Sequence, residues 1–179
     1  MKKNVIVFGL ISGAIVTAMM LVSVILCYKD PDFRGSMVIG YTAMLLAFSF
    51  IFIGIKNYRD KYNGGVITFG KAFLTGLYIA LIASTMYVVV WLISYYFFIP
   101  DFMERYSAHI MTQARKDGAD AATLLRTQAD MNRYSEMYRN PLFVVLLTYM
   151  EILPLGLLIT LISALILKRR TPAGNAVVS

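Results

Sequence analysis

The sequence predicts an all-α integral membrane protein, a bundle of four transmembrane helices with an extracytoplasmic helical segment between the third and the fourth. Two observations predict this class. Of the 179 residues, 59% are hydrophobic and the mean hydropathy is +0.67, which is too high for an ordinary soluble domain. The apolar residues are also gathered into four runs, each close to or above the roughly 20 residues that a helix needs to cross about 30 Å of hydrocarbon.

The four predicted spans lie at about residues 5–27, 37–55, 72–99 and 142–167. They form a single membrane domain over residues 1–170, followed by a flexible cytoplasmic tail at 171–179. The first run is interpreted as a retained span because it is longer than the apolar region of a signal peptide, about 7–15 residues, and no Ala-x-Ala cleavage site follows it. The lone cysteine, Cys27, cannot form a disulfide within the chain.

The positions of lysine and arginine predict the orientation in the membrane. In a chain with four spans, the amino end, the loop after the second span and the carboxyl end share one side, where one acid, Asp60, accompanies nine bases. The bases are Lys2, Lys3, Lys56, Arg59, Lys61, Lys71, Lys168, Arg169 and Arg170. The other side carries eight bases and eight acids. The positive-inside rule therefore places both termini in the cytoplasm, and the net charge of +7 needs no nucleic-acid partner to explain it.

The segment at residues 100–140 is predicted to form a helical hairpin on or above the outer leaflet. Its first half has apolar residues at helical spacing, namely Phe102, Tyr106, Ile110 and Ala114. Gly118 interrupts this pattern, and Asp120 can cap a second helix over residues 121–138. Two interpretations stay open: a connector between spans, or a surface for a partner or ligand.

Small residues recur at four-residue spacing within each span, which places them on one helix face where two backbones can approach closely. The sets are Gly9, Gly13 and Thr17; Ala43 and Ala47; Ala72, Gly76, Ala80 and Ser84; and Gly156, Thr160 and Ala164. They predict close packing inside the bundle, with contact between subunits as the alternative.

The fourth span contains one carboxylate, Glu151, about 15 Å from the outer start of its helix and hence near the middle of the bilayer. Three residues later, Pro154 lacks the amide that would bond to the carbonyl of Met150. None of the polar side chains expected at this depth is basic: Thr17, Tyr41, Thr42, Ser84, Thr85 and Tyr87. The candidate intramembrane polar site comprises Glu151, Pro154, Tyr41, Thr42, Ser84 and Thr85. It is either a proton or cation site or a structural hydrogen bond between helices.

A second candidate site is the basic cluster of Lys56, Arg59, Lys61 and Lys71 on the cytoplasmic side. Lysine and arginine next to a membrane span attract anionic lipid headgroups. The cluster is therefore interpreted as an anionic-lipid contact, or alternatively as an ordinary anchor of the topology.

Residues 40–76 resemble a family of small bacterial four-span membrane proteins that is known only as a domain of unknown function. The resemblance rests on Gly40-Tyr41, Ile55-Lys56, Tyr58-Arg59-Asp60, Gly64-Gly65 and Phe69-Gly70-Lys71-Ala72-Phe73. It implies a four-span protein of the bacterial inner (plasma) membrane, and it carries over no catalytic position. Asn63, Gly64 and Gly65 are also expected to form a turn with positive backbone angles.

The spans contain no His-rich metal set and no His–Asp or Cys–His pair, and the chain has no glycine-rich phosphate loop. We therefore expect a non-enzymatic protein without cofactor or metal. The favoured role is a structural or accessory membrane component that contacts lipids and a partner, either another membrane protein or a further copy of the chain. The alternative is a proton- or cation-linked small transporter or channel centred on Glu151.

Overall fold

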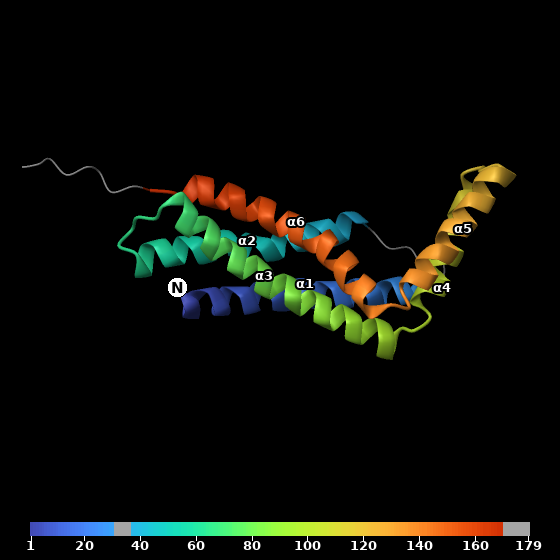
Figure 1. Ribbon diagram of the computed structural model, residues 1–179, viewed down its shortest axis with the longest axis horizontal. Coiled ribbons are helices and arrows are strands. Elements are labelled where there is room, and N and C mark those ends of the chain that lie inside the picture. Colours follow the sequence, from blue (N-terminus) through green and yellow to red (C-terminus); the bar gives the residue numbers. More distant parts are fainter. Residues whose placement is uncertain (31–36, 170–179) are drawn as a thin grey trace, which may run out of the picture.

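The computed structural model describes residues 1–30 and 37–169. Its long helices are α1 (Lys2–Lys29), α2 (Met37–Tyr62), α3 (Phe69–Ile93) and α6 (Pro141–Leu167), and between α3 and α6 lie the π-helix η1 (Ser94–Phe98), α4 (Phe102–Lys116) and α5 (Ala121–Met137) (Figure 1). Within the described chain, four helices are long and apolar enough to cross a membrane. The protein is a multi-pass membrane protein, and the predicted fold class is confirmed. The predicted tail at 171–179 lies outside the described residues.

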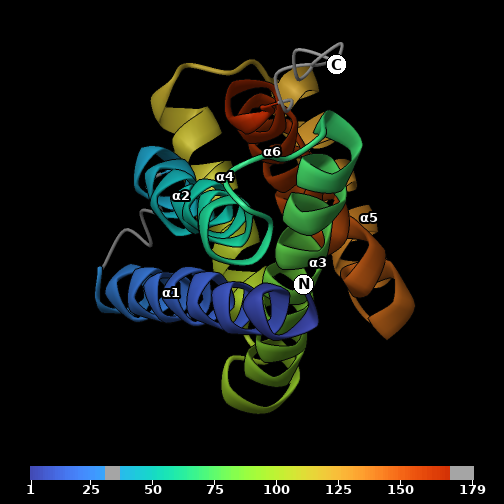
Figure 2. The ribbon, with the colours of Figure 1, turned by 90° about the vertical axis from the view of Figure 1, so that its left-hand side faces the viewer.

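The four long helices form an elongated bundle with two chemically different ends. α1 and α3 run from the end that holds the amino terminus, and α2 and α6 run back to it (Figure 1). We call this the basic end, and the opposite one, where α4 and α5 project, the hairpin end. Seen along the bundle, α2 and α3 lie between α1 and α6 (Figure 2), and both inner helices pack against both outer ones. Phe48, Ile51, Ile79 and Ile152 are completely buried at the centre.

The small residues lie where the helices cross, as the four-residue spacing predicts. All twelve of them are buried. A Cβ atom added to Gly9 of α1 would lie 2.8 Å from Cβ of Ile82 on α3, and one added to Gly76 of α3 would lie 2.8 Å from Cγ2 of Thr160 on α6. Because contacts this short do not occur between real side chains, glycine is what lets these backbones approach.

The basic end is closed by the segment between α2 and α3. Gly64 and Gly65 have φ values of 64° and 78°, which confirms the predicted turn. The turn leads to Ile67, whose main chain exchanges two hydrogen bonds of 2.9 Å with the main chain of Arg169. Arg59 also donates from Nη1 to the carbonyl oxygen of Leu167 over 3.4 Å. Part of the stretch that resembles the family therefore ties the end of α6 to the loop between α2 and α3.

The hairpin end contains the two helices predicted for residues 100–140. Gly118 has φ 78° between them, and the carboxylate of Asp120 accepts a hydrogen bond of 2.8 Å from the amide of Thr123, which is the predicted cap. Two tyrosine hydroxyls connect the hairpin to the bundle. The Tyr28 hydroxyl of α1 donates to Asp101 over 2.8 Å, and the Tyr96 hydroxyl of η1 donates to the carbonyl of Tyr138 over 2.9 Å.

Candidate functional site

Glu151 lies on α6 and points out of the bundle. Its side chain is exposed although its neighbour Ile152 is completely buried, because the two positions are about 100° apart on a helix. Pro154, Leu158 and Ile162 follow at intervals of three and four residues on the same face of α6, and all are exposed. Glu151 makes no hydrogen bond or ion pair with the residues the structure describes. We call the set Glu151, Pro154, Leu158 and Ile162 the outer face of α6.

Pro154 adds a second polar group to this region. α6 continues through it without a break, but proline has no amide hydrogen to offer the carbonyl of Met150. The side chain of Met150 itself is 73% exposed. The outside of α6 therefore combines a carboxyl group and a carbonyl without its usual helical donor, about halfway along a membrane-spanning helix.

Two tyrosines lie near the carboxyl group of Glu151. It interacts electrostatically with Tyr87, a buried residue of α3, and with Tyr138, which follows the last turn of α5. Burial raises the pKa of Tyr138 to about 12, and the negative charge of Glu151 contributes to this increase. The phenol of Tyr138 is therefore protonated at neutral pH.

Tyr138 was missed by the sequence analysis because it belongs to the hairpin, 13 positions before Glu151. Only the path of α5 back to the bundle brings it near α6. Its place in an aromatic pair with Tyr95, with ring centroids 5.3 Å apart, fixes that approach. A tyrosine two positions before the helix-starting pair Asn140-Pro141 is the one signal that could have marked it.

The other predicted members of the polar site lie on two other helices, α2 and α3. Tyr41 and Thr42 are exposed on α2. Ser84 is completely buried on α3, and its hydroxyl has no hydrogen-bond partner in the described chain. Thr85 is exposed, donates to the carbonyl of Leu81 over 2.7 Å and lies 2.8 Å from the hydroxyl of Tyr149 on α6. Their grouping with Glu151 into one site stays a prediction.

In the predicted basic cluster, two side chains make hydrogen bonds and two others are exposed. Arg59 pairs with Asp60 over 2.6 Å besides its bond to Leu167. Lys71 donates to Oδ1 of Asn63 over 2.9 Å and its ammonium lies 5.6 Å from the ring centre of Tyr58. Lys56 and Lys61 are exposed. Contact of these four residues with anionic lipid also stays a prediction, and the structure shows that two of them already stabilise the basic end.

Among residues 1–30 and 37–169, no three His, Cys, Asp or Glu side chains lie together in a way that could hold a metal ion. The arrangement at Glu151 can accept a proton or a hydrogen bond from a group outside the described chain. Its chemistry is that of a single carboxyl group at an apolar surface.

Comparison with known proteins identifies the family. A family model described as "Protein of unknown function (DUF4199)" matches residues 7–169, so the match includes all four long helices and the hairpin. A search of curated proteins and a search of solved structures gave no match. The matched range is most of the chain, and it contains the motif at residues 40–76 that carries the resemblance. The chain belongs to the DUF4199 family of proteins of unknown function.

Proposed function

We propose that this protein is a non-enzymatic accessory component of the bacterial inner membrane, and that the outer face of α6 binds a helix of a partner membrane protein. The observation that supports this role is the exposure of Glu151 on a membrane-spanning helix without a partner in the described chain. Both termini are placed in the cytoplasm in this proposal, and the exposed Lys56 and Lys61 at the basic end contact anionic lipids.

The physical basis is the cost of a carboxyl group among acyl chains. An acidic residue at the centre of a membrane helix costs about 2.5–3.5 kcal/mol on insertion scales. A hydrogen bond between two membrane helices recovers about 0.6 kcal/mol on average and up to about 1.7. A partner helix that carries a donor opposite Glu151 lowers this cost, and Leu158 and Ile162 add apolar contact on the same face.

Site-specific crosslinking in native membranes tests the proposal. A photoreactive residue at Leu158, on the outer face of α6, is expected to give one discrete adduct with a membrane protein. The matched control is the same residue at Leu45, which is similarly exposed, 51% against 52%, but lies on α2. Glu151→Leu should lower the adduct about three- to fifteen-fold because the hydrogen bond is lost, whereas Glu151→Gln, which can still bond, should retain it.

Two results would count against this role. One is equal labelling from Leu158 and Leu45, which indicates contact with lipid alone. The other is an adduct whose yield does not change in the Glu151→Leu variant. An adduct of twice the chain mass would identify the partner as a second copy of the protein. The outer face of α6 would still be the binding surface.

The alternative function is proton- or cation-linked transport through Glu151. It is supported by the electrostatic interaction of Glu151 with Tyr87. One turn before Tyr87 on α3, the buried hydroxyl of Ser84 also lacks a hydrogen-bond partner among the described residues. Glu151→Gln separates the two functions, because glutamine keeps a hydrogen bond but cannot exchange a proton. If vesicles with this variant lose a pH-driven flux while the crosslink is retained, Glu151 functions in transport. If the flux is unchanged, Glu151 takes no part in any transport mechanism.

A further inference from the structure

α1 and α3 leave a groove at the basic end of the bundle. The helices are in closest contact at Gly9 and Gly13, where an added Cβ would lie 2.8 Å from Ile82 and 2.5 Å from the sulfur of Met86. From there the two helices separate toward the basic end (Figure 1). The space between them measures about 370 Å³ and is open to the surroundings of the bundle. In a membrane, this opening faces the acyl chains.

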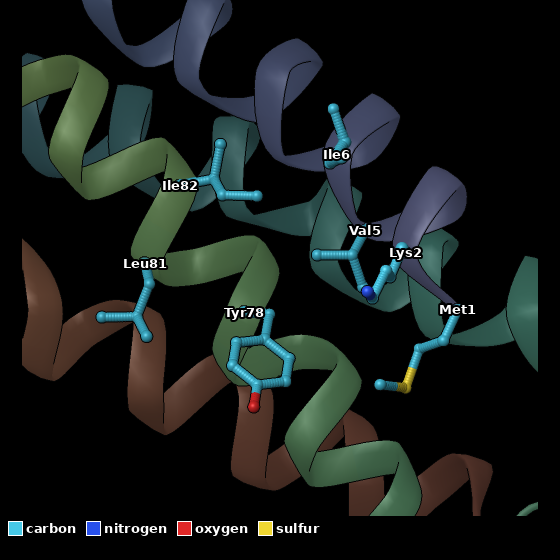
Figure 3. A pocket seen from close by; sticks show the side chains of 7 residues that line it. All are labelled: Met1, Lys2, Val5, Ile6, Tyr78, Leu81 and Ile82. Atoms are coloured by element: carbon cyan, nitrogen blue, oxygen red, sulfur yellow. The ribbon is translucent and has the colours of Figure 1, made fainter.

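The lining of this groove is apolar except at one end. The lining residues are Met1, Lys2, Val5 and Ile6 of α1 and Tyr78, Leu81 and Ile82 of α3. Figure 3 shows the side chains of Lys2 and Val5 directed toward the side of α3 that carries Tyr78 and Ile82. Lys2 has the one charged side chain among these lining residues, and it makes no ion pair with the residues described by the structure. The groove is therefore apolar along most of its length and positively charged at the end near Lys2.

A second groove continues the first along α3. It measures about 440 Å³ and shares Leu81 and Ile82 with the first, and its other lining residues are Thr85, Met86, Val89 and Val90. From Tyr78 to Val90 the helix rises about 18 Å at 1.5 Å per residue. One leaflet of a bilayer with a hydrocarbon core of about 30 Å is about 15 Å thick. The track is therefore longer than one leaflet, and its far part passes Thr85, at the depth expected for the middle of the bilayer; an acyl chain that starts beside Lys2 needs only the nearer part.

We propose that this track binds one anionic phospholipid of the leaflet next to the basic end, with an acyl chain along Leu81 and Ile82 and the phosphate beside Lys2. The hydrocarbon chain gains little from the groove itself, since it leaves one apolar environment for another. Selectivity therefore comes from charge: Lys2 favours an anionic headgroup over a zwitterionic one. This site is independent of Glu151 and of the proposed partner.

Native mass spectrometry of the full chain, purified in a mild detergent and titrated with phosphatidylglycerol or phosphatidylcholine, tests the charge requirement. The wild-type protein is expected to retain one phosphatidylglycerol molecule more tightly than phosphatidylcholine. Lys2→Gln should weaken phosphatidylglycerol binding about fivefold, which corresponds to about 1 kcal/mol, without changing phosphatidylcholine binding. Lys3→Gln is the matched control, because Lys3 is the next residue of the same turn and does not line the groove.

A second pair of variants tests the groove itself. Leu81→Trp fills the point where the two grooves meet and should reduce bound phosphatidylglycerol to the background level. Leu74→Trp places the same ring on an exposed part of α3 outside the lining and should leave binding unchanged. Equal effects of Lys2→Gln and Lys3→Gln, equal affinity for the two lipids, or full retention of lipid by a helical Leu81→Trp protein would each overturn the proposal.

Discussion

At the scale of single residues, Asp101 joins several polar contacts at the hairpin end. One carboxylate oxygen accepts from the Tyr28 hydroxyl over 2.8 Å and the other from Nε of Arg105 over 2.5 Å. The guanidinium of Arg105 also lies 4.9 Å from the ring centre of Tyr28. These groups connect the end of α1 to the start of α4. The hydrogen bonds from Arg105 and then Tyr28 lower the pKa of Asp101 below its usual value.

This lowered pKa predicts that the effect of Asp101→Asn on thermal stability depends on pH. Because the folded-state pKa is lowered, the stabilising contribution is complete above the ordinary carboxyl pKa of about 3.9 and is lost as the pH falls through the folded-state value. At pH 7 the variant should unfold about 1–4 °C lower than the wild type, the range expected for a surface ion pair. Near pH 2 the difference should disappear.

Thermal unfolding in detergent, followed by circular dichroism between pH 2 and 7, measures this difference. Asp130→Asn on α5 is the control, since this exposed carboxylate should contribute nothing at either pH. A difference between Asp101→Asn and the wild type that is the same at every pH would show that the carboxylate charge is not what stabilises the junction.

Sequence reasoning placed Glu151 correctly in a membrane-spanning helix but could not say which way it points. The apolar run around it shows no periodicity that separates a buried from an exposed face, since Leu153 and Leu158 are as hydrophobic as the buried Ile152. The direction depends on which face of α6 packs against α2 and α3, and the small residues Gly156 and Thr160 mark that face. The position of Tyr138 depends on the tertiary path of the hairpin, which the neighbouring helix-start signal Asn140-Pro141 does not specify.

At the scale of the helices, hydropathy predicted the part of each helix that lies in hydrocarbon and not its full length. The second span was predicted to end at residue 55, whereas α2 continues to Tyr62. The extra turns contain Lys56, Arg59 and Lys61, which are polar but form helices readily, and backbone hydrogen bonding does not stop where the membrane does. The π-helix η1 was not predicted either, because i to i+5 bonding has no pattern of residue types that distinguishes it.

Helix packing makes a prediction about Gly9. In the Gly9→Ala variant the new methyl group would lie 2.8 Å from both Cβ and Cγ2 of Ile82, and a β-branched side chain cannot move its Cβ without moving its backbone. The free energy of unfolding should fall by about 1–3 kcal/mol, the usual cost of overpacking. The measurement is SDS-induced unfolding in mixed micelles, followed by far-UV circular dichroism.

Gly70→Ala is the matched control for this substitution. Gly70 lies in the first turn of α3, and nothing stands within 4 Å of an added Cβ there. This variant should be as stable as the wild type or slightly more stable, because alanine favours the helix. Equal loss of stability in both variants would mean that the effect arises from the glycine backbone and not from the contact between α1 and α3.

At the scale of the whole molecule, the two ends of the bundle differ in charge. The basic end brings together residues 2 and 3, the loop after α2 and the end of α6 (Figure 1). Among the described residues, Asp60 is the one acid that accompanies the bases of these segments. The hairpin of α4 and α5 carries six bases and six acids. For this asymmetry the positive-inside rule predicts insertion with the basic end in the cytoplasm, because lysine and arginine in short loops are retained on that side.

Cysteine accessibility in intact bacterial cells tests this orientation. In a Cys27→Ser background, which removes the one native thiol, a membrane-impermeant maleimide should label Gly118→Cys in the exposed turn between α4 and α5. It should label Lys61→Cys, exposed at the basic end, only after the inner membrane is permeabilised. Both sites are exposed, so a difference between them reports the side of the membrane and not burial. Labelling of Lys61→Cys but not Gly118→Cys in intact cells would reverse the topology and would place the lipid at Lys2 in the opposite leaflet.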